Sequence, residues 1–193
     1  LAEACAAAVD PGSPETARAS GPLIARIWSV TAAEDEVRDR ADLLVLWFCD
    51  SPILGEFLRR CPPATISGSA RRTISVGPSP PAVPGPEHVV VPAESAVDLA
   101  RIVEATIREL DMDAGGDSVV LAAARFVAAA AAAAGTVGVV TDWRRDAVGL
   151  DAWSSTSLVR ALAHVKPAFE LPLGERSDDA VAVCTWRYGA AGA

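Results

Sequence analysis

Short, unbroken runs of apolar residues recur along this sequence, separated by longer segments whose apolar residues follow a helical spacing. The run "DLLVLWF" (42–48) is the clearest, and it contains no polar residue after Asp42. Such continuous runs are typical of strands that are buried on both faces of a parallel sheet. We therefore predict strands at 42–48, 71–77, 87–91 and 136–142, an extended segment at 168–173, and a strand or turn at 178–188.

The segment "SAVDLARIVEATIREL" (95–110) is the clearest helix, because its apolar residues recur every three or four positions. Thr31 and Glu34 have the spacing of a capping box at the start of a helix expected over 31–41. Asp50 or Ser51 is expected to cap the next helix, with Pro52 in its first turn. Further helices are predicted at 1–9, 20–28, 50–61, 118–133 and 154–165.

The alternation of helices and short apolar strands predicts an α/β fold, a Rossmann-like, mostly parallel sheet with helices on both faces. We find no internal repeat and no linker between domains, so residues 1–193 are expected to form one such unit. The loop at 78–86 is rich in proline and excludes regular structure. The sequence begins with Leu1 and ends with "YGAAGA", so we expect it to be part of a longer or processed chain, with no signal peptide.

Composition excludes several classes of function. The formal net charge of -8 argues against a nucleic-acid partner, which would require a basic face. The long run "FVAAAAAAAGTVGVV" is mostly alanine and is interrupted by Gly135 and Gly138, so we expect a packed helix leading into a strand and no membrane span. The four cysteines are widely spaced and the two histidines have no second ligand nearby, so no metal site is expected and the cytoplasm is the expected compartment.

No catalytic motif is visible in the residues themselves. The turn after the first strand, in "WFCDSPILGEF", lacks the glycine-rich pattern of a dinucleotide site, and there is no Walker loop or G-x-S-x-G. His164 is expected within a helix and His88 in a loop or edge strand. Three arginine pairs are candidates for binding phosphate or carboxylate, although solvated helix ends and strand starts are the simpler interpretation: Arg59–Arg60, Arg71–Arg72 and Arg144–Arg145.

Three segments resemble the B-type subunit of formylmethanofuran dehydrogenase, a molybdopterin oxidoreductase. "EVRDRADLLVLWFCDSPI" (36–53) resembles the family's "RADVV-x-x-W-G-x-NP" strand. "RRTISVGPSPP" (71–81) lies where the family has its "VVDPR" strand and loop, with Gly77 in place of the acidic residue. "AVCTWRYGAAGA" (182–193) resembles its "LTWQTGYP" stretch. The resemblance implies the α/β domain of a molybdopterin oxidoreductase.

The departures from this family concern its metal site. Redox-active relatives have "CHGP", whose cysteine binds tungsten or molybdenum, and this sequence has Ala19, Ser20, Gly21 and Pro22 there. A methyl group cannot ligate a metal, since a thiolate or selenolate is required. The N-terminal cysteine cluster for an iron–sulfur centre is also missing from this sequence. The resemblance therefore implies a degenerate site, with no catalytic residue, metal or cofactor of its own in this subunit.

This pattern is similar to the B-type subunit of the bacterial formyltransferase/hydrolase complex. That resemblance implies a non-redox scaffold that contacts amidohydrolase-like, formyltransferase and C-type subunits. The complex would convert formyl-tetrahydromethanopterin, through formyl-methanofuran (methylofuran), to formate. Arg71, Arg72 and Arg144 are candidates to guide the acidic arm of the coenzyme. Two alternatives stay open: a redox-active molybdopterin subunit and a free-standing Rossmann-like protein that binds a small molecule.

Overall fold

A five-stranded parallel sheet forms the centre of the protein in a computed structural model that describes residues 31–110, 118–142 and 150–173. The strand order is β3-β2-β1-β4-β5, and every neighbouring pair of these strands is parallel. The predicted α/β fold is therefore confirmed, and the expected extended segment at 168–173 is a full strand. The strands are β1 (Leu43–Trp47), β2 (Arg72–Gly77), β3 (Glu87–Val90), β4 (Val137–Thr141) and β5 (Ala168–Pro172).

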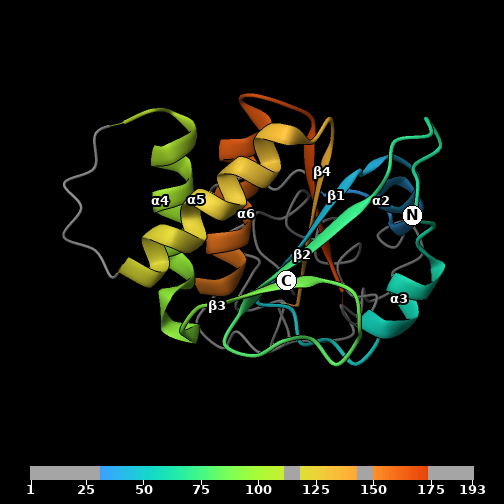
Figure 1. Ribbon diagram of the computed structural model, residues 1–193, viewed down its shortest axis with the longest axis horizontal. Helices are drawn as coiled ribbons and strands as arrows, with labels where there is room; N and C mark the ends of the chain where they lie inside the picture. The colour runs from blue at the N-terminus through green and yellow to red at the C-terminus, as the bar shows by residue number, and fades with distance from the viewer. Residues whose placement is uncertain (1–30, 111–117, 143–149, 174–193) are drawn as a thin grey trace, which may run out of the picture.

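Helices cover both faces of the sheet, as Figure 1 shows. Leu43, Val45 and Trp47 of β1 face one layer, while Leu44 and Leu46 face the other, because successive side chains of a strand alternate. All five are buried, which explains the unbroken apolar run. The first layer contains α4 (Ala96–Ile107), α5 (Ser118–Ala133) and α6 (Leu150–Ala163), and the short helix η1 (Ala93–Ser95) leads into α4. The second layer contains α2 (Glu34–Arg40) and α3 (Leu54–Arg60).

Contacts at Gly138 and Asp42 position α2 and the loop after α5 against the sheet. A Cβ atom at Gly138 of β4 would lie 3.0 Å from Val37 Cγ1 of α2 and 3.1 Å from Ala41 Cβ. The lack of a side chain at Gly138 therefore allows α2 to pack closely on β4. Before β1, the Asp42 carboxylate accepts hydrogen bonds from the backbone N–H groups of Gly135 and Thr136, so the loop after α5 is anchored at the start of the sheet.

The alanine-rich segment forms the predicted helix, α5, and its C-terminal end is capped by a side chain from another loop. Lys166 Nζ donates hydrogen bonds to the backbone carbonyls of Ala131, Ala132 (2.9 Å) and Ala134 (2.7 Å). The last carbonyls of a helix lack the N–H partners that a further turn would supply, although Ala131 O also accepts from the N–H of Ala134 (3.2 Å). A cation at this end also complements the helix dipole. Among the described helices, none is long and apolar enough to span a membrane.

Three predicted helix starts are wrong, and the reasons are local. The expected capping box fails because α2 begins at Glu34 with Ala33 as its N-cap and no side-chain cap, while Thr31 forms a parallel bridge with Glu170 of β5. The helix expected from Asp50 begins at Leu54, since Ser51 and Pro52 belong to a preceding turn. The helix expected from Ser154 begins four residues earlier, at Leu150.

Candidate functional site

The strand order places a topological switch point between β1 and β4. The chain leaves β1 through α3 to reach β2 on one side, and it reaches β4 on the other side only after crossing α4 and α5. In sheets of this kind ligands bind outside the carboxyl ends of the strands at the switch point. We therefore define the switch edge as residues 48–51, which follow β1, together with Thr141 and Asp142 at the end of β4.

Polar side chains at the switch edge are buried. Thr141 is 2% exposed, Asp142 is 3% exposed and Ser51 is 7% exposed. Cys49 is also buried, as expected for a small apolar side chain in this fold. Within the described ranges, no group of three or more His, Cys, Asp or Glu side chains could hold a metal ion. The switch edge therefore offers hydroxyl and carboxylate groups, but no recognisable metal-binding cluster in the described part.

Phe48, directly after β1, has a backbone conformation that is unusual for a bulky residue. Its φ angle is 47°, in the left-handed region that favours glycine. Its N–H donates a 2.8 Å hydrogen bond to the carbonyl of Val76 in β2. The Phe48 ring packs edge-to-face on Trp47, with ring centroids 5.4 Å apart. Residues held in such conformations often lie at functional sites, where the surrounding packing maintains them.

Trp47 connects the switch edge to α6. The Trp47 side chain is fully buried, and its Nε1–H donates a 3.0 Å hydrogen bond to Ser154 Oγ. Ser154 Oγ donates in turn to the backbone carbonyl of Asp151 in the first turn of α6. On the same helix, Thr156 Oγ1 donates to Oε2 of the buried Glu170 in β5. These bonds fix the position of α6 relative to β1 and β5.

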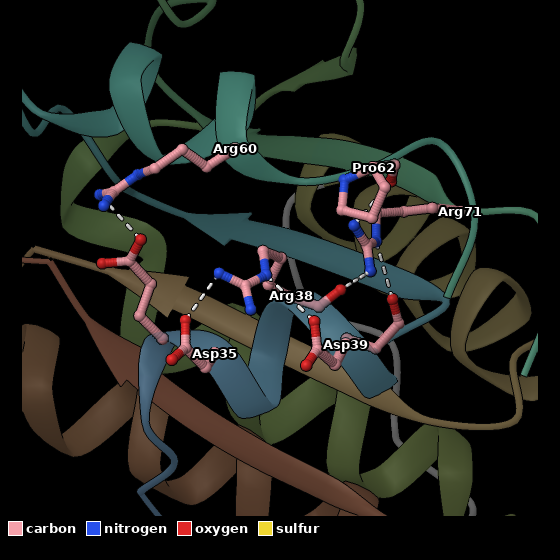
Figure 2. Close-up of polar contacts among 8 residues, drawn as sticks. Asp35, Arg38, Asp39, Arg60, Pro62 and Arg71 are labelled. Carbon is pink, nitrogen blue, oxygen red and sulfur yellow. Dashed lines mark hydrogen bonds and ion pairs between the residues drawn. The ribbon is translucent and has the colours of Figure 1, made fainter. Parts of the chain in front are cut away.

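Arg71, one of the predicted coenzyme-binding arginines, holds together two loops and a helix end (Figure 2). Its guanidinium donates from Nε to the carbonyl of Ala41 (2.9 Å), from Nη1 to that of Pro62 (2.7 Å) and from Nη2 to that of Arg38. Nearby, Arg60 pairs with Glu34 and Arg38 pairs with Asp35. Arg71 therefore joins the end of α2 to the loop after α3.

Arg72 already binds a carboxylate in this structure. Its Nε and Nη2 each donate a 2.9 Å hydrogen bond to Glu87 of β3, one to each carboxylate oxygen. The hydrogen bonds from Arg72 lower the pKa of Glu87. The Arg72 guanidinium carbon also lies 5.4 Å from the centre of the Phe126 ring. Since Arg72 begins β2, this group lies at the amino edge of the sheet, opposite to the switch edge.

The remaining candidate residues, the two histidines and Cys61 lie in different places. Ala19, Ser20, Gly21, Pro22 and Arg144 lie outside the described residues. His88 lies in the edge strand β3, as expected, with its Nδ1 3.2 Å from Ser75 Oγ. His164 is exposed and follows the last residue of α6 rather than lying within that helix. Burial raises the pKa of the Cys61 thiol, so Cys61 is kept protonated and is a poor nucleophile.

Sequence reasoning missed the unusual backbone of Phe48 and the carbonyl contacts of Arg71. Nothing in the local pattern around Phe48 signals a left-handed residue, since a bulky side chain argues against one. The partners of Arg71 lie up to 33 positions away in the sequence. The absence of a glycine-rich turn after the first strand was the one available signal for this edge of the sheet.

A solved structure shares this fold. No protein-family model matches the sequence, and no curated protein is similar enough to be a relative. One structural match is a chain of the formyltransferase/hydrolase complex (FhcABCD) from Methylorubrum extorquens, solved in complex with methylofuran. The two chains are 22% identical with a TM-score of 0.66. The match covers 98% of this chain but only 53% of the other, so this chain spans about half the length of its structural neighbour.

Proposed function

We propose that this protein is a non-redox scaffold subunit of a formyltransferase/hydrolase complex in cytoplasmic one-carbon metabolism. The observation that carries the proposal is the structural match across 98% of the chain to a component of the FhcABCD complex. The sequence motifs independently resemble the B-type subunit of such complexes. In this proposal the complex converts formyl-tetrahydromethanopterin, through a formylated methylofuran-type coenzyme, to formate. The chemistry takes place on amidohydrolase-like and formyltransferase subunits, and a C-type subunit completes the assembly.

The charge pattern of the described residues is consistent with a scaffold. Among the arginine pairs, Arg71 uses its guanidinium to bind three backbone carbonyls, which is a structural role. Arg38 and Arg60 are paired with carboxylates of α2. These contacts stabilise the layer formed by α2 and α3, and the bonds from Trp47 and Thr156 stabilise the layer on the other face.

The proposal is tested by purifying the protein from its native source and analysing the intact assembly by native mass spectrometry with elemental analysis. We expect three further subunit types and no stoichiometric molybdenum or tungsten in this chain. Purification as a stable monomer would favour a free-standing small-molecule binder. Stoichiometric molybdenum or tungsten would favour the redox-active alternative. Either result would overturn the scaffold proposal.

Arg72 is the better candidate of the two described arginines for contact with an acidic coenzyme arm. It is 43% exposed at its side chain and already binds a carboxylate with two nitrogen atoms, so a glutamyl carboxylate could replace Glu87. We expect Arg72→Glu to raise the KM of the assembled complex for its coenzyme about tenfold, because a charge-assisted hydrogen bond is worth about 1.5–3 kcal/mol. The matched control is Arg108→Glu, which also removes an exposed ion pair, that with Glu104. Equal effects of both changes would contradict a role for Arg72.

A further inference from the structure

The family that the sequence resembles uses a molybdopterin cofactor, and the described residues after β1 do not fit a group of that kind. We propose that Phe48 closes the carboxyl end of β1 to pyrophosphate-bearing cofactors, with the small residue Gly77 beside its ring. This inference goes beyond the loss of metal ligands at Ala19 and Ser20, because it concerns a different part of the chain. The inference deepens the proposed function, and it rests on that proposal in one respect, namely that this chain has a role without redox chemistry.

Binding a pyrophosphate after the first strand of such a sheet requires an uncovered backbone. Glycine is used there because the phosphates must approach the main chain closely, and because N–H groups must point toward them. Neither condition is met at Phe48. The residue carries a large side chain, and its N–H already donates to the carbonyl of Val76.

The backbone at Phe48 has the conformation that glycine adopts readily. In the family pattern "W-G-x-NP", Trp47 matches the tryptophan and Phe48 stands at the next position, that of the glycine. The φ angle of 47° is left-handed. A bulky residue therefore occupies a backbone conformation that favours glycine, and the conformation is retained at an energetic cost.

Gly77 lies beside this ring at the end of β2. A Cβ atom at position 77 would lie 3.6 Å from the Phe48 Cα and 3.8 Å from its Cδ1, which is ordinary van der Waals contact. A Cβ atom alone therefore fits at position 77, and crowding against the ring is expected only from the further atoms of a larger side chain such as that of aspartate. The family has an acidic residue in the corresponding "VVDPR" strand and loop. Phe48 and Gly77, the two positions that depart from the family pattern, are 29 positions apart in the sequence and are neighbours in space.

Packing on the other side of Phe48 holds the ring in this position. The ring contacts Trp47 edge-to-face at an interplanar angle of 74°. Trp47 is itself fixed by its hydrogen bond to Ser154 of α6. The Phe48 side chain is packed against the core under α4, α5 and α6. The aromatic pair therefore joins the carboxyl ends of β1 and β2 to this helical layer.

The first test is a double-mutant cycle measured by urea unfolding of the full chain, with any accompanying subunits removed equally from all variants. We expect Gly77→Asp to raise the equilibrium constant of unfolding in both backgrounds. The factor should be about ten times larger in the wild-type background than in the Phe48→Gly background, since neighbouring residues couple at this level. Phe48→Ala removes the ring but keeps a Cβ atom, and it should relieve the same coupling. Additive effects of the two positions would overturn the pairing of Phe48 with Gly77.

The second test measures binding of inorganic pyrophosphate by isothermal titration calorimetry, with far-UV circular dichroism confirming that each variant is folded. We expect the wild-type protein and the control Phe126→Ala to show no binding at millimolar pyrophosphate. Phe48→Gly should bind at least about tenfold more tightly than the wild type, because it removes the ring and also lets the backbone turn its N–H away from Val76. Phe48→Ala removes the ring alone and should gain less. Binding by the wild type would overturn the closure, and no gain in either Phe48 variant would overturn its assignment to Phe48.

These outcomes are distinct from a failure of the proposed function. A protein that co-purifies with partner subunits but binds pyrophosphate contradicts only the closure by Phe48. A protein that excludes pyrophosphate but purifies alone contradicts only the scaffold role.

Discussion

Gly138 determines how closely α2 packs on the sheet. A methyl group there would lie 3.0–3.2 Å from Val37, Ala41 and Leu44, all of them buried. We expect Gly138→Ala to lower the free energy of unfolding by about 1–3 kcal/mol, the usual cost of overpacking a core. Gly55→Ala in α3 is the matched control. Its Cβ would meet only Val83 Cγ1, at 3.1 Å, and alanine favours the helix. Urea unfolding of both variants measures the difference, and equal losses would contradict this packing.

His88 makes the stability of the protein depend on pH. Burial lowers the pKa of His88 below its ordinary value of 6.5. The unfolded chain therefore takes up a proton more readily than the folded protein as the pH falls. Stability contributed by neutral His88 is present above about pH 6.5 and is lost on acidification toward the lowered folded pKa.

Urea unfolding between pH 7.5 and pH 5 tests this dependence. We expect the wild-type protein to lose more stability over this range than His88→Gln, which cannot titrate. His164→Gln serves as the control because His164 is exposed at the surface, and it should behave like the wild type. A wild-type profile that coincides with that of His88→Gln would contradict the assignment.

At the scale of elements, Lys166 stabilises α5 from outside the helix. Its ammonium group donates to three carbonyls at the end of α5, and the contact links that helix to the loop before β5. We expect Lys166→Met to lower the free energy of unfolding by about 1–3 kcal/mol, since hydrogen bonds from a charged group are lost. Arg160→Met, which removes an exposed cation from the last turn of α6, should have little effect. A comparable loss in both variants would show that net charge and not the cap is responsible.

The elements differ in how well the sequence predicts them. The strands follow from runs such as "DLLVLWF", because burial on both faces leaves a signal within a few residues. The start of α2 does not follow, because Thr31 pairs with Glu170, which lies at the opposite end of the described chain. A capping box is a local pattern, and a bridge to a distant strand outweighs it here.

The geometry of the candidate site is harder to predict from the sequence than the strands are, because it too depends on contacts between distant residues. The lack of a glycine-rich turn after β1 is visible in the sequence and agrees with the geometry at Phe48. The contact between Phe48 and Gly77 is invisible there, because it depends on the parallel pairing of β1 with β2. Arg71 looks like a ligand-binding residue in the sequence, yet its partners are carbonyls that only the fold brings together.

At the scale of the whole molecule, the sheet separates two apolar cores. Val37 of α2 belongs to one core and Val103 of α4 to the other, and both side chains are fully buried. The two side chains lie on opposite faces of the sheet, in separate core clusters. Residues that are well separated and share no partner normally contribute independently to stability.

We therefore expect Val37→Ala and Val103→Ala to cost about 2 kcal/mol each, and the double variant to lose their sum within about 0.5 kcal/mol. Fluorescence and far-UV circular dichroism should report one coincident urea transition, because β1 and β4 contribute side chains to both cores and neither layer can unfold without them. Separate transitions in either single variant would show that the two layers are independent units. A strongly non-additive double variant would show instead that the sheet transmits strain from one core to the other.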